Sequence, residues 1–260
     1  MIDTHCHLDA TRFDADRGEV LERAWAAGVS GIVVPGVAPG EWEPLLALTR
    51  GDRRLHAGLG IHPQALPSLP EAEDDAALAT LDALLGEGTA IAVGECGLDG
   101  PSLPGAPMER QLKVLRAHFA LARKHRLPLL LHCFHAHPAL GQLLTEEPLP
   151  ERGAILHSYS GGAELAKGYA KRGLYFGFAG PVTFAEARKP LESVRAVPLD
   201  RLLVETDAPD QAPHPHRGER SEPSYLPRMV EALARARGVS VAEMAAQTTE
   251  NARRLFGEGL

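Results

Sequence analysis

The sequence predicts an α/β fold, a (β/α)₈ TIM barrel with extra helices at its C-terminal end. The chain has 260 residues, close to the ~250 that one such barrel takes. Short apolar runs alternate with helix-like stretches, which favours parallel strands joined by helices. Eight such units occur, the number that closes the barrel. We therefore expect residues 1–260 to form a single barrel domain.

Each predicted strand is a short run of apolar or β-branched residues that leads into Gly, Pro or polar residues. The eight strands are expected at residues 1–5, 31–34, 55–60, 90–94, 127–132, 153–157, 173–177 and 201–205. Helical periodicity of the apolar residues predicts helices between them. The clearest of these lie at residues 18–27, 74–85, 109–124, 163–171 and 223–237.

The extra C-terminal helices are predicted from local signals. Ser240 and Glu243 have the spacing of a capping box, which begins one helix. Residues 248–256 are expected to form another, ended by Gly257. A doubly wound open sheet is the structural alternative, but no Gly-x-Gly-x-x-Gly follows the first predicted strand. Pro- and Gly-rich loops are expected at residues 100–107 and 209–223.

Composition narrows the class of protein. The net charge of −7 argues against broad non-specific binding of nucleic acid, although bound divalent ions would make one site locally positive. The N-terminus lacks a basic region followed by an apolar one, and no apolar run is long enough to span a membrane. With only three cysteines, we expect a reduced, cytoplasmic protein without a membrane segment.

Ionisable residues follow the predicted strands where a parallel barrel carries its active site, at the strands' C-terminal ends. Because strand side chains alternate, His5 and His7 are expected to point the same way. The adjacent thiols of Cys6, Cys96 and Cys133 are then expected to face outward and pack with apolar side chains. Six ionisable side chains suit a divalent cation, and together they predict a metal cluster. They are His5, His7, Glu95, His132, His157 and Asp207.

Seven short motifs spread over almost the whole chain carry a family resemblance. They are residues 2–9 (IDTHCHLD), 60–63 (GIHP), 94–99 (GECGLD), 131–133 (LHC), 157–161 (HSYSG), 205–209 (ETDAP) and 251–257 (NARRLFG). The chain resembles the TatD family of metal-dependent deoxyribonucleases, which are amidohydrolase-like barrels. The resemblance implies that one metal is held by His5, His7 and Asp207, and a second by His132 and His157. It implies that Glu95 bridges the two.

The sequence departs from the family pattern at three places. Phe134 stands where the family often has Arg, and residues 100–102 stand where aromatic residues often follow the GLD motif. Ser158 and Tyr159 replace the usual Cys and Phe. The first two departures lie where substrate would bind, so they bear on the substrate more than on the metals.

Catalytic roles are expected for three residues. Asp207 is the candidate general base, because a metal-held carboxylate stays ionised and can orient water. Glu205 is expected either to support the site from behind or to form a salt bridge at the edge of the core. His62 precedes Pro63, which keeps its backbone extended, and is expected to hydrogen-bond a substrate phosphate; a structural role is the alternative.

Other polar residues have open interpretations. His135 and His137 follow strand five and could contact substrate in place of the missing Arg. Arg217 and Arg220 lie after strand eight, where such barrels often bind phosphate, but a solvated loop is the alternative. The remaining candidates, His56, His118 and His125, are expected at surface or helix positions without a catalytic role.

The leading hypothesis is a hydrolase with two divalent metal ions, whether Zn, Mg or Mn, that acts as a DNA exonuclease on single strands or 3′ ends. We expect a monomer. The alternative is a metal-dependent hydrolase of another ester, such as an aminoacyl-tRNA deacylase or a small-molecule esterase, which Phe134 and the acidic net charge favour. A non-catalytic metal-binding protein is a third possibility, disfavoured by the complete ligand set.

Overall fold

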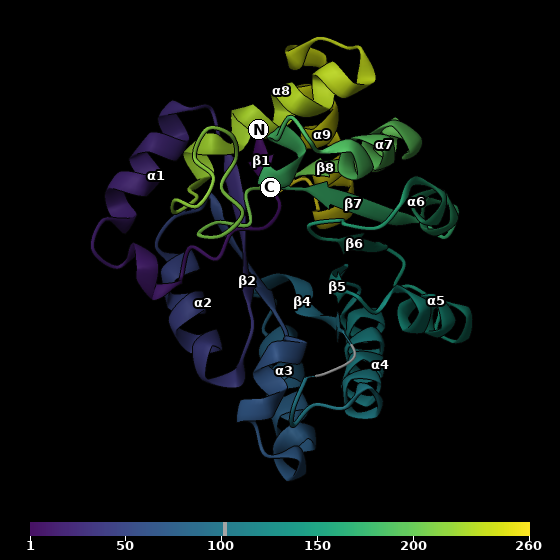
Figure 1. Ribbon diagram of the computed structural model, residues 1–260. Helices are drawn as coiled ribbons and strands as arrows, with labels where there is room; N and C mark the ends of the chain where they lie inside the picture. Colours follow the sequence, from purple (N-terminus) through teal and green to yellow (C-terminus); the bar gives the residue numbers. More distant parts are fainter. Residues whose placement is uncertain (101–102) are drawn as a thin grey trace.

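The computed structural model describes residues 1–100 and 103–260. Eight parallel strands follow one another in chain order around a barrel (Figure 1). They are β1 (Ile2–Asp3), β2 (Gly31–Gly36), β3 (Leu55–Leu59), β4 (Ala90–Asp99), β5 (Leu129–Phe134), β6 (Ala154–Leu156), β7 (Leu174–Phe178) and β8 (Leu202–Val204). The predicted (β/α)₈ barrel is confirmed.

Helices connect the strands and cover the outside of the barrel (Figure 1). They are α1 (Arg17–Ala26), α2 (Trp42–Arg50), α3 (Asp74–Gly86), α4 (Met108–His125), α5 (His137–Glu146), α6 (Ala163–Ala170), α7 (Arg188–Ala196), α8 (Leu226–Arg237) and α9 (Val241–Phe256). No helix among the described residues is long and apolar enough to cross a membrane.

The strand ends differ from the sequence prediction at the positions that matter for function. β1 and β8 end at Asp3 and Val204, so the predicted strands 1–5 and 201–205 were too long. The Thr4 amide donates a hydrogen bond to the Val204 carbonyl, 3.2 Å away, and joins the first segment to the last. β4 runs on to Asp99, with an irregular register between Val93 and Cys96. The residues at the barrel mouth therefore sit on short loops and a bulge as well as on strands.

The interior of the barrel is apolar below the mouth. Side chains from seven strands form one buried cluster: Ile2, Val33, Ala92, Leu130, Ile155, Tyr175 and Leu203. Ala252, Leu255 and Phe256 of α9 belong to the same cluster. Because the barrel core and this helix share one cluster, α9 closes the floor of the barrel, opposite the mouth.

The C-terminal segment corrects one prediction. Residues 248–256 do not form a separate helix, because α9 runs without interruption from Val241 to Phe256. The capping box of Ser240 and Glu243 is present as predicted. Thr248, a weak helix former, lies inside α9, and its hydroxyl donates to the Met244 carbonyl, 2.9 Å away.

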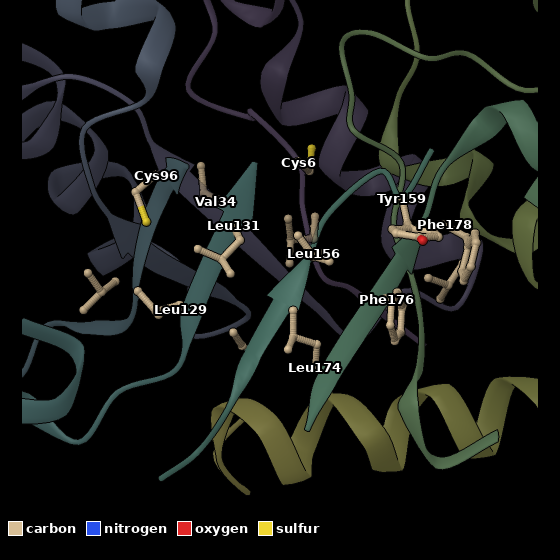
Figure 2. Packing of buried hydrophobic residues seen from close by; sticks show 14 of the residues in the cluster. Cys6, Val34, Cys96, Leu129, Leu131, Leu156, Tyr159, Leu174, Phe176 and Phe178 are labelled. Carbon is tan, nitrogen blue, oxygen red and sulfur yellow. The ribbon is translucent and has the colours of Figure 1, made fainter. Parts of the chain in front are cut away.

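The cysteines lie where the alternation of side chains predicted. Cys6 and Cys96 are fully buried in the apolar layer between strands and helices, with Leu129 and Leu131 (Figure 2). Cys133 is partly buried against the same layer, and its Sγ lies 3.3 Å from His137 Nδ1. The predicted loop 209–223 contains no helix or strand before Pro223, where a short 3₁₀ turn begins. The predicted loop 100–107 includes residues 101 and 102, which lie outside the described part of the chain.

Candidate metal centre

All six predicted ligands converge at the C-terminal mouth of the barrel. His5, Glu95, His157 and Asp207 are buried, while His7 and His132 are partly buried. Leu130 in the core and His132 at the mouth are two residues apart on β5, so the strand that fills the barrel also aims this imidazole inward. The burial of so many ionisable groups requires partners for each of them.

One group of four atoms surrounds a point on one side of Glu95. The Nε2 atoms of His5 and His7 are 3.3 Å apart, and Glu95 Oε2 is 3.2 and 3.5 Å from them. Asp207 Oδ1 is 3.7 Å from both nitrogens. Ligands held tetrahedrally at ~2.0–2.1 Å from Zn²⁺ would be about 3.3–3.4 Å apart. The separations in this group therefore fit a bound cation.

The second group lies on the other oxygen of the same carboxylate. Glu95 Oε1 is 2.8 Å from His157 Nε2 and 3.3 Å from His132 Nδ1, and these two nitrogens are 3.1 Å apart. His62 Nε2 is 3.1 Å from the same oxygen. Each oxygen of Glu95 thus faces its own set of imidazoles, which is the arrangement of a bridging carboxylate.

The pKa shifts of the clustered residues indicate that the carboxylates of the site lack a matching positive charge. Burial acts to raise the pKa of Glu95, but His157, His62 and His5 outweigh it and hold that pKa well below its usual range. Burial lowers the pKa of His5 to about 4, whereas Glu95 and the acidic residues beyond it overcome burial and raise that of His157 to about 10. These two rings stack with centroids 4.0 Å apart, so they cannot both carry a proton at low cost. The donor set fits divalent cations, which replace those protons.

Two residues orient the candidate ligands, although neither was assigned a role from the sequence. Asp99 Oδ2 lies 3.5 Å from His132 Nε2 and accepts a hydrogen bond from Gln64 at 2.5 Å. A carboxylate behind a metal-binding imidazole fixes the ring and raises its basicity. Gln211 donates to Asp207 Oδ2, leaving Oδ1 toward the histidines. Asp99 was visible as the last residue of the GECGLD motif, but nothing in the sequence marked Gln211.

Glu205 lies behind the ligands. It is fully buried, accepts hydrogen bonds from the Ser158 amide (2.5 Å) and the Thr4 hydroxyl (3.1 Å), and lies 3.9 Å from His157 Nδ1. Burial raises its pKa to about 8. These contacts join the segments after β1, β6 and β8, so they fit the predicted supporting position behind the cluster.

The His62 ring is held so that its Nε2–H, a hydrogen-bond donor, points into the cluster. Its Nδ1 accepts a hydrogen bond from the Gln64 amide at 3.1 Å, so the neutral ring carries its proton on Nε2. That Nε2 faces Glu95 Oε1. The amide just before it, that of Ile61, donates to His118 Nε2 at 3.0 Å. His118 is on a helix as expected, but it is fully buried and anchors the loop that carries His62.

A cavity of about 850 Å³ opens above the cluster, and it extends over the loops after β1, β2 and β3. Arg12, Asp9, Glu41, Gln64 and Asp210 line it beside the cluster. The sequence did not predict that the cavity would extend over these loops, because its course depends on how the loops pack.

Four residues with open interpretations lie outside the described lining of that cavity. Arg217 pairs with Glu186 at 2.7 Å, and Arg220 pairs with Asp16 at 2.6 Å. His137 begins α5 and faces Cys133, while the ring of His135 packs against Phe134. The positions of Arg217 and Arg220 agree with the alternative to phosphate binding, in which both are loop residues, and each is paired with a carboxylate.

The fold and the site define a (β/α)₈ barrel with a candidate metal centre at its mouth. The profile of the family described as "TatD related DNase" matches residues 2–257. The chain belongs to the TatD family.

Curated relatives and a solved structure agree with this assignment. The chain is 39% identical to the uncharacterized metal-dependent hydrolase YabD of Bacillus subtilis, with 98% of each chain covered. It is 37% identical to the 3′-5′ ssDNA/RNA exonuclease TatD of Cronobacter sakazakii, over 98% of this chain and 97% of the relative. The crystal structure of the TatD homolog YJJV from Escherichia coli superposes with a TM-score of 0.91 at 33% identity, covering 98% of this chain and 97% of that one.

Proposed function

We propose that the protein is a two-metal exonuclease that removes nucleotides from the ends of single-stranded DNA. The observation that carries the proposal is Glu95, whose two oxygens face separate sets of imidazoles, 3.2 Å from His5 and 2.8 Å from His157. Relatives named 3′-5′ ssDNA/RNA exonucleases support the substrate class and the polarity. We expect a cytoplasmic monomer with a single domain.

In this proposal His5, His7 and Asp207 would hold one divalent ion, His132 and His157 would hold the other, and Glu95 would bridge them. Imidazoles favour Zn²⁺, whereas the carboxylates and a phosphate substrate also admit Mg²⁺ or Mn²⁺. Bound metal ions would lower the pKa of water and neutralise charge on a phosphate.

The protein's own groups then do three things. Asp207 Oδ1, with its other oxygen held by Gln211, orients the attacking water and accepts its proton. His62 donates a hydrogen bond from Nε2–H to a phosphate oxygen, a role for which its tautomer is already set by Gln64. Glu205, hydrogen-bonded to Ser158 and Thr4, keeps the segments that carry the ligands in place.

The shape of the mouth favours a strand end over a duplex. A cavity of about 850 Å³ lies within the size range of small-ligand sites, so it can take a terminal segment. Phe134 is 47% exposed and follows His132 on the same face of β5. Phe134 replaces the Arg that the family often has, a departure that favours another ester as substrate, and it lies outside the described lining of the cavity. Its exposed ring nevertheless offers a surface on which a base can stack, worth ~1–3 kcal/mol per base.

The decisive experiment uses single-stranded DNA labelled at its 5′ end and, separately, at its 3′ end, with Mg²⁺ or Mn²⁺. We expect release from the 3′ end, loss of activity with EDTA, and a fall of at least about a hundredfold in kcat for Asp207→Asn. Asp200→Asn, an exposed carboxylate before β8, is the matched control and should keep full activity. Intact DNA and RNA under every metal tested would refute the nuclease.

A hydrolase of another ester remains the second candidate, and one observation favours it. Asp9, Glu41 and Asp210 line the cavity, and Arg12 is the sole arginine or lysine in its described lining. Such a surface repels a run of phosphates except where metal ions offset it. Turnover of an aminoacyl ester or a small carboxylic ester, with no cleavage of nucleic acid by the same preparation, would support this candidate.

A further inference from the structure

Five arginines gather around a second cavity, which we call the arginine pocket. Its volume is about 570 Å³. The arginines that line it are Arg126, Arg152, Arg172, Arg201 and Arg254. In a chain with a net charge of −7, this is a local concentration of positive charge.

The arginine pocket lies at the end of the barrel opposite the metal cluster. Gly153, Gly173 and Arg201 in its lining come just before β6, β7 and β8, respectively. Arg254 comes from α9, which closes the floor. The candidate metal ligands lie at the other ends of the strands, so a ligand in this pocket would not touch them.

The positive charge in the pocket is poorly neutralised by the protein. Arg126, Arg152 and Arg172 have no carboxylate within 4 Å in the described parts of the chain, residues 1–100 and 103–260. Arg201 is 3.9 Å from Asp200, and Arg254 is 3.4 Å from Glu250. Among residues of the described lining, Glu151 supplies the one carboxylate. Guanidinium groups that line one cavity repel one another, and a multivalent anion relieves that repulsion.

Two contacts position side chains that line the arginine pocket. Arg172 donates a hydrogen bond of 2.5 Å to the Leu144 carbonyl, which positions its guanidinium. The guanidinium of Arg201 lies 4.6 Å from the ring centroid of Tyr175, a side chain buried in the barrel core. Tyr175 is the aromatic residue of the described lining, and Arg201 covers its ring. The pocket therefore offers charge and hydrogen-bond donors to phosphate, and little surface on which a base could stack.

We propose that the arginine pocket binds an oligophosphate anion through its phosphate groups, separately from the metal centre. The volume is in the range that holds a small ligand. Arginine is the residue best suited to bidentate contacts with phosphate oxygens. Inorganic tripolyphosphate and the triphosphate of a nucleotide share this chemistry.

The test is isothermal titration of the metal-loaded protein with tripolyphosphate and, separately, with ATP. Mg²⁺ is kept in excess over either probe, so that chelation is complete before mixing. We expect both probes to bind, more weakly as ionic strength rises. The double variant Arg126→Gln/Arg152→Gln, which removes two exposed arginines without ion pairs, should raise both Kd values at least tenfold.

The matched control is Arg228→Gln/Arg235→Gln, which removes two exposed arginines from α8 outside the pocket. It should leave both Kd values unchanged. Unaltered circular dichroism and unaltered DNA turnover without probe would show that both double variants are folded. Tighter binding of tripolyphosphate would indicate an inorganic oligophosphate as the ligand, and tighter binding of ATP would indicate a nucleotide. The proposal is overturned if tripolyphosphate does not bind, or if both double variants weaken binding equally.

Discussion

At the scale of single residues, the candidate site depends on carboxylates that orient imidazoles. Asp99 lies behind His132, 3.5 Å from the nitrogen that faces away from Glu95. It is itself held by Gln64. The second metal position is therefore expected to depend on a residue that does not touch the metal.

Replacing Asp99 with Asn should lower metal affinity or activity about 10–100-fold, because outer partners of metal-bound histidines have effects of that size. Raising the metal concentration should restore part of the activity, which loss of a substrate contact would not allow. Activity measured against Mn²⁺ concentration tests this. Asp75→Asn, at an exposed position on α3, is the control, and an equal loss there would contradict the interpretation.

Residues of the site that lie at strand ends could be predicted from the sequence, whereas those on loops could not. The convergence of the six candidate ligands was predictable because they lie at or just after the ends of predicted strands, and the barrel brings strand ends together. Gln211 was not, since it reaches Asp207 from a loop whose path is set by packing rather than by periodicity. The reach of the cavity toward Arg12 and Glu41 was unpredictable for the same reason.

At the scale of elements, α4 supports the mouth of the barrel through His118. Its Nδ1 donates to the Val114 carbonyl at 2.8 Å, and its Nε2 accepts from the Ile61 amide. Burial lowers the pKa of His118 to about 4, partly offset by the bond to Val114. The ring must stay neutral to accept from Ile61, so it ties the loop of His62 to α4 while unprotonated.

This contact predicts a dependence of stability on pH. The pKa of His118 is lower in the folded chain than its ordinary 6.5, so protonation favours unfolding. The contribution of His118 is complete above about pH 6.5 and falls by about 3 kcal/mol as pH drops toward 4. His118→Phe should cost ~1–3 kcal/mol at pH 8, where it leaves the Ile61 amide unpaired.

Urea unfolding of the metal-free wild type and His118→Phe, from pH 4 to 8, tests this. The free energies of unfolding should approach each other as pH falls, because the variant has no ring to protonate. A constant difference across the range would contradict the assignment.

The order and kind of elements could be predicted, but not all of their ends. Periodicity located the eight strands and the helices α1, α3, α4, α6 and α8, whereas α2, α5 and α7 were not among the named helices. β1 and β8 proved shorter than predicted. Their ends depend on bonds such as that from Thr4 to Val204, which join residues 200 positions apart in the chain. The prediction of a separate helix at 248–256 was wrong because α9 runs on through Thr248.

At the scale of the whole molecule, metal binding is expected to stabilise the barrel, because the candidate ligands come from β4, β5 and the segments after β1, β6 and β8. A ligand at a hundred times its Kd adds about 2.7 kcal/mol to the free energy of unfolding. For a chain of this size, removal of metal by EDTA should then lower Tm by about 5–10 °C.

Thermal unfolding with and without EDTA tests this prediction. Glu95→Gln should abolish most of the difference in Tm, since it removes the charge shared by both positions. The control Glu164→Gln, at an exposed helix position, should retain it. An equal metal effect in wild type and Glu95→Gln would contradict a shared carboxylate.

The pairing of the first segment with the last has a consequence for how the protein is made. Asp207 is synthesised some two hundred residues after His5, and α9 follows after that. Until then β1 lacks one neighbour, the floor of the barrel is open, and the apolar strands depend on protection from aggregation. We therefore expect the six candidate metal ligands to come together only after the segment that follows β8 has been synthesised.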